Sequence, residues 1–400
     1  MKAMAADTWV VLGDTPEFDT PVPVGQLYFP DWARYEAAMR GIFARQYYTN
    51  QGPLAQELEQ RLAGFLGVRH VVCVTNATIG LLMAVKALDL RGKVLVPAFT
   101  FPATVQALTW AGVAPAFCDV DLQTQQLDVA AARAQIGPDV SAILGVNLWG
   151  GACDIAALQD MARKNGLRLF FDSAHAFGCR AGGVPIGNFG ELEVFSFHAT
   201  KILSATEGGC ICTNDDLLAA RLRNIRSSYG AGTPTPVPLT SNGRMSEAQA
   251  AVGLMSLEDF PRILARNRQL HERYQAGLAH VPGLQLVRPS GVDTTNYQYL
   301  VTRIDASRFG LTRDQLLAVL KAENINVRRY FHPGMHRALP YVDELPWYRD
   351  ALPATDLLCH TSLQFPLGAL VSDDTVDRIC ARVAAAHANA ARIRAALGGS

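Results

Sequence analysis

One lysine stands between a short apolar run and a pair of glycines in the stretch Phe195-Ser-Phe-His-Ala-Thr-Lys201-Ile-Leu-Ser-Ala-Thr-Glu-Gly-Gly209. A lysine withdrawn from water has a lowered amine pKa and becomes nucleophilic. Ser196 offers a hydroxyl of the kind that holds a phosphate, and the glycine pair lets the backbone pass close to a flat ligand. Because a lone lysine is most often exposed at a protein surface, a second feature is needed before Lys201 is interpreted as a reactive amine.

The second feature lies upstream, where an apolar run ends at Asp172 and is followed by small residues and His175. Ligands of open α/β sheets bind at the carboxyl ends of the strands, and the sequence predicts that Asp172 lies at such an end. A lysine that forms a Schiff base and an aspartate that pairs with a pyridinium nitrogen are the protein's part of pyridoxal phosphate (PLP) chemistry. The two features together predict a PLP enzyme.

The chain resembles the sugar aminotransferases of the DegT/StrS group within the fold-type-I PLP enzymes. The stretch Ser196–Lys201 with Glu207-Gly-Gly209 matches the lysine motif of that group, and Asp172-Ser-Ala-His175 matches its Asp-x-Ala-(His/Gln) motif. The resemblance runs from about Thr49 to about Leu367. It implies that Lys201 binds PLP covalently and transfers protons, and that Asp172 keeps the ring nitrogen protonated. For His175 it leaves two roles open, orienting Asp172 or lying against the ring.

The fold implied by the resemblance is α/β, with a mostly parallel mixed sheet flanked by helices in a large domain and a smaller α+β C-terminal domain. Strands that alternate with helices through about residue 215 independently favour a mainly parallel sheet with covered faces. We predict an N-terminal extension at 1–35, a large PLP-binding domain at 36–260 and a small domain at 261–400. Within the small domain, alternation predicts strands at 297–304, 327–333 and 363–367.

Further cofactor contacts follow from the resemblance. Ala77 and Thr78 lie in a turn between a short buried strand and a predicted helix at 79–90. The free N–H groups and the dipole at the start of such a helix favour a phosphate; the family usually has Gly-Thr where this chain has Ala77-Thr78. Phe101 corresponds to an aromatic that stacks on the cofactor ring, and Ser196 contacts the phosphate. Asn242 corresponds to an asparagine that reaches the phosphate of the neighbouring subunit, which implies a homodimer with shared active sites. The family commonly has histidine at the position of Asn147, whose role stays open.

The predicted reaction moves an amino group from glutamate to a nucleotide-linked keto sugar. Tyr48 and Asn50, in a loop that resembles a substrate loop of the family, and Tyr330 and His332, near the end of a predicted strand, are the candidate substrate contacts. The loop most resembles that of enzymes that aminate C4 of a dTDP-4-keto-6-deoxyhexose. Amination at C3, UDP- or GDP-linked sugars, a PLP lyase or dehydratase, and a non-catalytic PLP-binding relative stay open as alternatives. Lys201 argues against those dehydratases that carry histidine instead of the lysine.

Composition excludes several other classes. Basic and acidic residues balance, 36 against 36, so no charge excess favours nucleic acid or a membrane surface as a partner. There is no Gly-x-Gly-x-x-Gly after a strand and no Gly-Lys-Ser/Thr loop, the signatures of nicotinamide and P-loop nucleotide sites. Eight cysteines are spread through the chain without a zinc or redox spacing, which predicts buried, reduced thiols, no metal site and a cytoplasmic protein.

Overall fold

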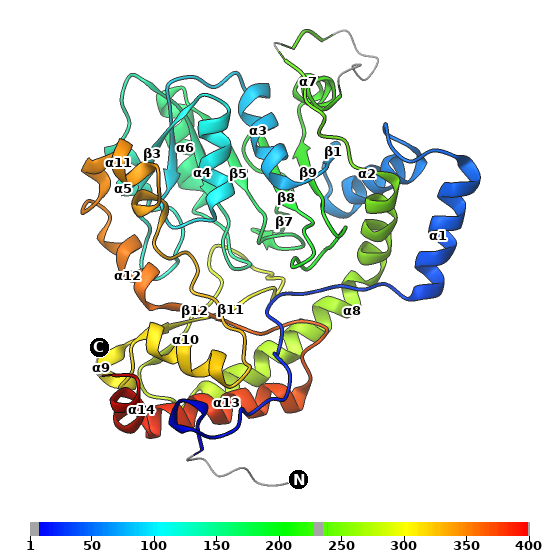
Figure 1. The fold of residues 1–400 in the computed structure, drawn as a ribbon. Helices are drawn as coiled ribbons and strands as arrows, with labels where there is room; N and C mark the ends of the chain where they lie inside the picture. The colour runs from blue at the N-terminus through cyan, green and yellow to red at the C-terminus, as the bar shows by residue number, and fades with distance from the viewer. Residues whose placement is uncertain (1–7, 228–234, 238, 399–400) are drawn as a thin grey trace.

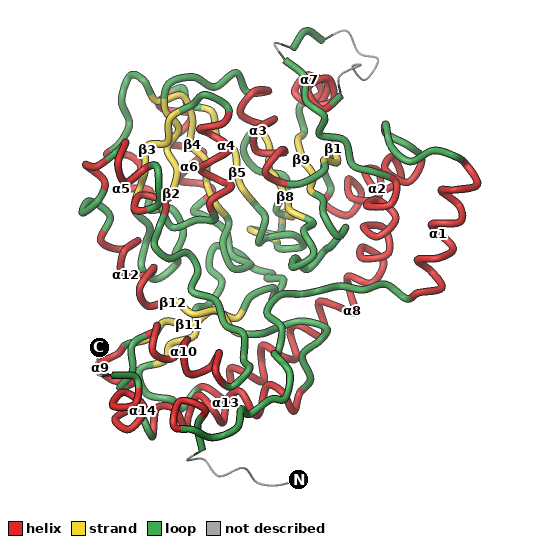
Figure 2. The backbone as a smooth tube through the Cα atoms, in the orientation of Figure 1, coloured by secondary structure: helices red, strands yellow, loops and turns green. Residues whose placement is uncertain are grey.

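The computed structural model describes residues 8–227, 235–237 and 239–398. The described residues form a larger part around a seven-stranded sheet and a smaller part around a three-stranded sheet (Figures 1 and 2). In the larger sheet the strand order is β1-β9-β8-β5-β4-β2-β3. Strands β3, β2, β4, β5 and β8 pair in parallel, whereas β9 is antiparallel to both β8 and β1. The predicted α/β fold with a mostly parallel mixed sheet is confirmed.

The strands of the larger sheet are short, as expected for buried strands between helices. Their bounds are β1 His70–Val74, β2 Lys93–Pro97, β3 Ala114–Cys118, β4 Val140–Val146, β5 Arg168–Asp172, β8 Leu192–Ser196 and β9 Gly209–Thr213. The remaining strands are β6 Arg180–Ala181 and β7 Val184–Pro185, which pair with each other, and β10 Leu284–Leu286, β11 Leu300–Ile304 and β12 Ser362–Phe365 of the smaller sheet.

Helices cover both faces of the larger sheet. Those in the larger part are α1 Trp32–Arg45, α2 Pro53–Leu66, α3 Ala77–Ala87, α4 Pro102–Trp110, α5 Val129–Ala134, α6 Ile155–Asn165 and α7 Asp216–Arg226. The others are α8 Glu247–Leu278, α9 Ala306–Phe309, α10 Arg313–Ala322, α11 Tyr341–Glu344, α12 Pro353–Thr361, α13 Asp373–Ala388 and α14 Ala390–Ala396, with short 3-10 helices η1 Val10–Leu12, η2 Met335–Arg337 and η3 Pro346–Tyr348.

Alternating side chains divide the core into two layers, because successive residues of a strand point to opposite faces. In β5, Leu169 and Phe171 join a cluster with helices α2, α6 and α8, whereas Phe170 joins a cluster with α3, α4 and α7 on the other face. Cys210 and Cys212 of β9 lie on the first of these faces. All eight cysteines are buried and unpaired, as predicted.

Helix α8 carries the chain from the larger part to the smaller one (Figure 1). It packs against α2 and α1 in the larger part and against α13 in the smaller part. The predicted domain boundary at 260/261 falls inside this helix, next to Pro261, and it stays a prediction. Trp9, Phe18 and Val22, from the predicted N-terminal extension, lie in the core of the smaller part; residues 1–7 lie outside the described residues.

Two of the three strands predicted for the smaller part are confirmed as β11 and β12, but residues 327–333 do not form a strand. Arg328 exchanges two backbone hydrogen bonds with Gln364 of β12, at 3.0 and 2.8 Å, and the pairing then stops. The reason is a turn, in which the N–H of His332 donates back to the carbonyl of Arg329 at 2.9 Å. The third strand of this sheet is instead β10.

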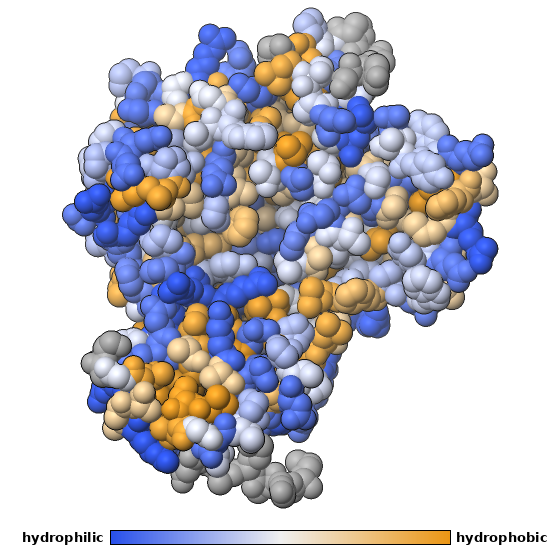
Figure 3. All heavy atoms as spheres, in the orientation of Figure 1, coloured by the Kyte–Doolittle hydropathy of each residue, from blue (hydrophilic) through white to orange (hydrophobic). Residues whose placement is uncertain are grey.

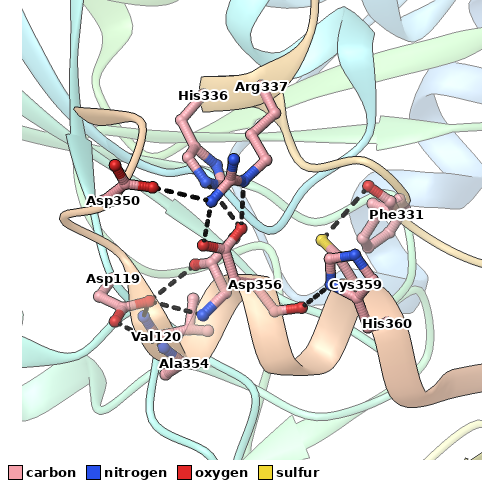
Figure 4. A network of polar contacts seen from close by, with 11 residues as sticks. Asp119, Val120, Phe331, His336, Arg337, Asp350, Ala354, Asp356, Cys359 and His360 are labelled. Carbon is pink, nitrogen blue, oxygen red and sulfur yellow. Dashed lines mark hydrogen bonds and ion pairs between the residues drawn. The ribbon is translucent and has the colours of Figure 1, made fainter. Parts of the chain in front are cut away.

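A polar network attaches α12 to the end of β3 (Figure 4). Asp119, directly after β3, accepts hydrogen bonds from the backbone N–H and the hydroxyl of Thr355, at 2.8 and 2.7 Å. The thiol of Cys359, in the same helix, donates to the carbonyl of Phe331 at 3.5 Å. Helix α12 therefore supports the turn that follows Arg328.

The surface mixes polar and apolar residues on the face shown in Figure 3, with an apolar group over the smaller part. Among the described residues, no helix has both the length and the apolar character that crossing a membrane requires.

Candidate active site

A cavity of about 230 Å³ lies where several strands of the larger sheet reach their carboxyl ends. This is the edge at which open α/β sheets bind ligands. Seven of the predicted cofactor residues line it, namely Ala77, Thr78, Phe101, Asp172, His175, Ser196 and Lys201. Tyr330, predicted to contact substrate, lines the same cavity. The fold thus brings together residues that are up to 253 positions apart, the separation of Ala77 from Tyr330.

Lys201 lies in the turn that follows β8. Its backbone N–H donates to the carbonyl of His198 at 2.9 Å, which closes the turn. Burial lowers the pKa of the Lys201 amine to about 8, although the charges of Tyr330 and Asp172 act in the opposite direction. The amine Nζ lies 3.0 Å from the hydroxyl of Tyr299. A sizeable share of this amine is therefore neutral at a mildly alkaline pH, as a nucleophile or base requires.

Asp172 is the last residue of β5 and is buried. Its Oδ2 accepts a hydrogen bond from Thr104 Oγ1 at 2.7 Å, and its Oδ1 accepts one from the backbone N–H of Ala174 at 3.1 Å. Since a carboxylate only accepts, Thr104 donates to it and accepts in turn from Thr100 Oγ1, 2.9 Å away. Burial raises the pKa of Asp172, opposed by Thr104, Ala174 and the nearby Lys201 charge.

His175 is held by aromatic neighbours. Its ring centroid lies 4.3 Å from that of Tyr299 and 5.3 Å from that of Trp149. Burial, together with the Lys201 charge, lowers the pKa of His175 well below its ordinary value, so the ring is neutral at physiological pH. Among the described residues, no hydrogen-bond partner faces its Nδ1.

A buried polar chain lies behind Asp172. Asn147 donates to Ser173 Oγ at 2.9 Å, and Ser173 in turn donates to a carboxylate oxygen of Glu193. The other oxygen of Glu193 accepts from the backbone N–H groups of Gly187 and Phe189, at 2.6 and 2.9 Å. Burial raises the pKa of Glu193 to about 7. These hydrogen bonds link the end of β4 to the turn after β5 and so hold Asp172 in place.

The N-terminus of α3 forms another wall of the cavity. Asn76 caps the helix by accepting from the N–H of Ile79 at 2.9 Å, and Ala77 and Thr78 are the first helical residues. Gly209 permits a close approach here, because a Cβ at that position would lie 2.8 Å from the backbone nitrogen of Ala77. The second glycine of the pair therefore lets β9 pack against the start of this helix.

A model of the DegT/DnrJ/EryC1/StrS aminotransferase family matches residues 33–384. The chain belongs to this family. A dTDP-4-amino-4,6-dideoxy-D-glucose transaminase of Shigella dysenteriae is 33% identical over 369 residues, which cover 91% of this chain and 99% of the relative. A GDP-perosamine synthase of Vibrio cholerae is 30% identical over 84% of this chain and 91% of its own.

Among solved structures, that of DesI in the presence of its TDP-sugar product is similar, with a TM-score of 0.92 and 39% identity over 98% of this chain and 99% of that chain. The family and the aminotransferase activity predicted from the sequence are thereby confirmed. The fold is that of the PLP-dependent aminotransferases.

Four predicted contact residues of this aminotransferase do not line the cavity. Tyr48, Asn50 and Asn242 are exposed. His332 lies in the turn after Arg328, with its ring 5.6 Å from that of His360. His332 does not line the cavity because residues 327–333 do not form the predicted strand. The turn after Arg328 directs the chain away from the cavity after Phe331.

Sequence reasoning missed several residues that contact the site. Thr104 holds Asp172, Tyr299 contacts Lys201, and Arg328 lines the cavity with its guanidinium 3.0 Å from the Tyr330 hydroxyl. None of the three belongs to a local motif. Asn147, where the family commonly has histidine, is fully buried and lines the cavity, and it also accepts from the N–H of Cys153 at 3.0 Å.

Proposed function

We propose that this aminotransferase uses PLP to move an amino group from glutamate to a nucleotide-linked keto sugar, at C4 of a dTDP-4-keto-6-deoxyhexose. One observation carries the proposal, namely that the amine of the half-buried Lys201, whose pKa is lowered, and the buried carboxylate of Asp172 line the same cavity. A primary amine for a Schiff base and an anion for a pyridinium nitrogen are the groups that PLP chemistry takes from its protein.

The residues of the cavity fit this cofactor. The helix N-terminus at Ala77 and Thr78 and the hydroxyl of Ser196 provide an anion site of the kind a phosphate needs. Asp172 would hold the ring nitrogen, and Phe101, at the cavity wall, would pack on the ring. When bound, PLP supplies an electron sink for the carbon that exchanges its amino group.

The chain itself supplies positioning and proton transfer. Lys201 would hold the cofactor, and its amine, once free, would carry a proton to and from the reacting carbon. The lowered pKa of Lys201, about 8, suits both tasks because the amine gains and loses its proton near neutral pH. Thr104 and the N–H of Ala174 orient Asp172 and favour its ionised form, opposing the burial that raises its pKa. His175, neutral and stacked among aromatic rings, would lie against the cofactor.

The nucleotide-sugar substrate is inferred from the relatives, whose names include a dTDP-linked and a GDP-linked amino sugar. The similarity to DesI, solved with a TDP-sugar product, favours a thymidine nucleotide. Tyr330 is the predicted substrate residue that lines this chain's cavity. Tyr48, Asn50 and Asn242 are exposed in one chain, and we assign them to the site of a second subunit in a homodimer.

The test is a panel of nucleotide-linked keto sugars incubated with the purified enzyme, PLP and glutamate, with products identified by mass spectrometry. We expect the amino product from a dTDP-4-keto-6-deoxyhexose and none when Lys201→Ala replaces the wild type. Amination of 3-keto sugars alone would refute the C4 assignment. Failure of every keto sugar, with PLP bound, would refute the proposed function.

A further inference from the structure

Within the described residues, the amine of Lys201 makes a hydrogen bond to the side chain of Tyr299. Its hydroxyl lies 3.0 Å from Lys201 Nζ, and the amine also lies 5.6 Å from the centroid of the Tyr299 ring. Tyr299 directly precedes β11 of the smaller sheet, whereas Lys201 follows β8 of the larger sheet. The contact therefore joins the two parts of the molecule at the reacting group.

The ring of Tyr299 is held on several sides. It is 6% exposed, packs against the imidazole of His175 at 4.3 Å, and lies 5.3 Å from the indole of Trp149. Trp149 is itself anchored, because its indole N–H donates to Gln125 Oε1 at 2.8 Å. With its neighbours buried and packed, the ring has little freedom to turn its hydroxyl away from the lysine.

The two residues on either side of Tyr297 hold the loops that carry the candidate catalytic groups. Asn296 is fully buried and donates to the carbonyls of His175 and Phe177, both at 3.0 Å. Gln298 accepts from the N–H of Ile202, the residue after Lys201, at 2.9 Å. The segment Asn296–Tyr299 thus contacts both the turn after Asp172 and the turn that carries Lys201.

We propose that Tyr299 is a positioning residue for Lys201, whose hydroxyl holds the free amine in the orientation from which it transfers protons. The inference rests on the proposed function, in which Lys201 is the reacting amine. No local sequence motif indicates this role for Tyr299. In this proposal the segment Asn296–Tyr299 also fixes the position of the Lys201 turn relative to the turn that follows Asp172.

The chemistry of a phenol suits this task. Burial raises the pKa of the Tyr299 hydroxyl well above its ordinary value, so the phenol stays protonated. A neutral hydroxyl accepts from an ammonium and donates to a neutral amine, so Tyr299 can hold Lys201 in both protonation states. Hydrogen bonds to charged groups are the stronger ones, so removing the hydroxyl disfavours the ammonium more than the amine. The pKa of the Lys201 amine should then fall further.

The first measurement compares wild type with Tyr299→Phe in the cofactor-free full-length enzyme. Pulses of acetic anhydride at a series of pH values label the amines, and mass spectrometry follows the peptide that contains Lys201, with other lysine peptides as internal standards. We expect the midpoint of Lys201 labelling to fall by about one pH unit in the variant, the change that a roughly tenfold loss of preference for the ammonium produces. Thermal melting confirms that the variant, which lacks one atom, is folded.

The matched control is Tyr297→Phe, in the same segment. The ring of Tyr297 packs against His271 at 5.4 Å rather than against the active site, so its loss of a hydroxyl should leave the labelling of Lys201 unchanged. In the loaded enzyme, Tyr299→Phe should slow the half-reaction with glutamate about tenfold and move its pH profile together with the labelling curve, whereas Tyr297→Phe should do neither.

A labelling curve of Tyr299→Phe that superimposes on the wild type, or that shifts equally in Tyr297→Phe, would overturn the inference whatever the turnover. The labelling needs neither cofactor nor substrate. A wild-type enzyme that aminates no keto sugar would therefore refute the proposed function and would be told apart from a failure of this inference.

Discussion

Replacement of Thr104 by valine removes the hydroxyl that lies 2.7 Å from Asp172 Oδ2. Valine keeps nearly the same shape, so the change isolates one hydrogen bond. Thr104 is fully buried and Asp172 is 6% exposed, so bulk water does not easily take the place of the lost donor. The variant also removes the partner of the Thr100 hydroxyl, 2.9 Å away. This loss lowers the free energy of unfolding by an amount that does not depend on pH.

The size of the effect depends on the charge of Asp172. A hydrogen bond to a charged group contributes about 1.5–3 kcal/mol and one between neutral groups about 0.5–1.5 kcal/mol. The free energy of unfolding should therefore fall by about 2 kcal/mol where Asp172 is ionised and by about 1 kcal/mol where it is protonated. The difference of about 1 kcal/mol raises the pKa of Asp172 by roughly 0.7 pH unit beyond the rise that burial already causes.

The sign of the pH dependence follows from linkage. Because burial raises the pKa of Asp172 in the folded state, the folded protein binds this proton more tightly than the unfolded chain. The stability that this group contributes is present at low pH and is lost as pH rises through the folded pKa. Thr104→Val strengthens that trend, so the deficit relative to wild type should grow from acidic to neutral pH.

The assay is chemical denaturation of the cofactor-free enzyme from about pH 8 downward, as far as both proteins stay folded. The control is Thr109→Val in the same helix, whose hydroxyl lies 2.9 Å from Tyr341 Oη. Both of those groups are neutral in this range, so the control deficit should not vary with pH. A Thr104→Val deficit as flat as that of the control would refute the assignment of this bond to an ionised Asp172.

Three further predictions concern the candidate site itself. Lys201→Ala should abolish turnover and the visible absorbance of covalently bound cofactor with little change in melting temperature; a borohydride-reducible adduct in the variant would contradict this. Asp172→Asn should retain PLP but slow the half-reaction with glutamate by at least about 100-fold, because a neutral pyridine is a weaker electron sink; stopped-flow absorbance measures the rate, and a near-normal rate speaks against the role. Mixing inactive Lys201→Ala and Asn242→Ala subunits should restore part of the activity, since one site of the mixed dimer is intact; no recovery after demonstrated subunit exchange would place both residues in one chain's site.

Much of the candidate site could be predicted because its residues lie in short motifs at the ends of strands. Asp172 ends β5 and Lys201 follows β8, which is parallel to β5 and pairs with it. Parallel neighbours place their carboxyl ends at one edge of the sheet, so two local patterns imply one site. The same reasoning placed Ala77 and Thr78 at the cavity, because a buried strand followed by a helix is visible in the sequence.

The residues that sequence reasoning missed reach the site from far away in the chain. Thr104 is 68 positions from Asp172, and Tyr299 is 98 positions from Lys201. A threonine in a helix and a tyrosine beside a strand have ordinary local surroundings, so only the tertiary packing reveals their partners. Thr104 meets Asp172 within the larger part, whereas Tyr299 meets Lys201 between the two parts. The predicted strand at 327–333 failed for a related reason. Its alternation fits a strand, but a turn after Arg328 ends the pairing after one residue.

The predicted residues that the cavity leaves out also follow a pattern. Tyr48 and Asn50 belong to the loop between α1 and α2, and Asn242 shortly precedes α8. These segments are neighbours, because the carbonyl of Tyr48 accepts from the N–H of Glu247 at 2.9 Å. The Glu247 carboxylate in turn accepts from the first backbone N–H groups available in α2, at 3.0 and 3.1 Å, so the junction is rigid.

Asn242, a predicted phosphate contact, and Tyr48 and Asn50, predicted substrate contacts, therefore lie on two adjoining segments. None of the three lines the cavity of its own chain. If one of them alone were excluded, a wrong assignment of that residue would explain it. Joint exclusion of Asn242, Tyr48 and Asn50 is consistent with the proposed symmetric dimer, in which the surface formed by the two segments would serve the partner's cavity and the partner's equivalent surface would serve this one. The mixing experiment with Asn242→Ala tests this arrangement. Repeating it with Tyr48→Ala in place of Asn242→Ala extends the test, because recovery with both variants is expected if the two segments enter the partner's site together.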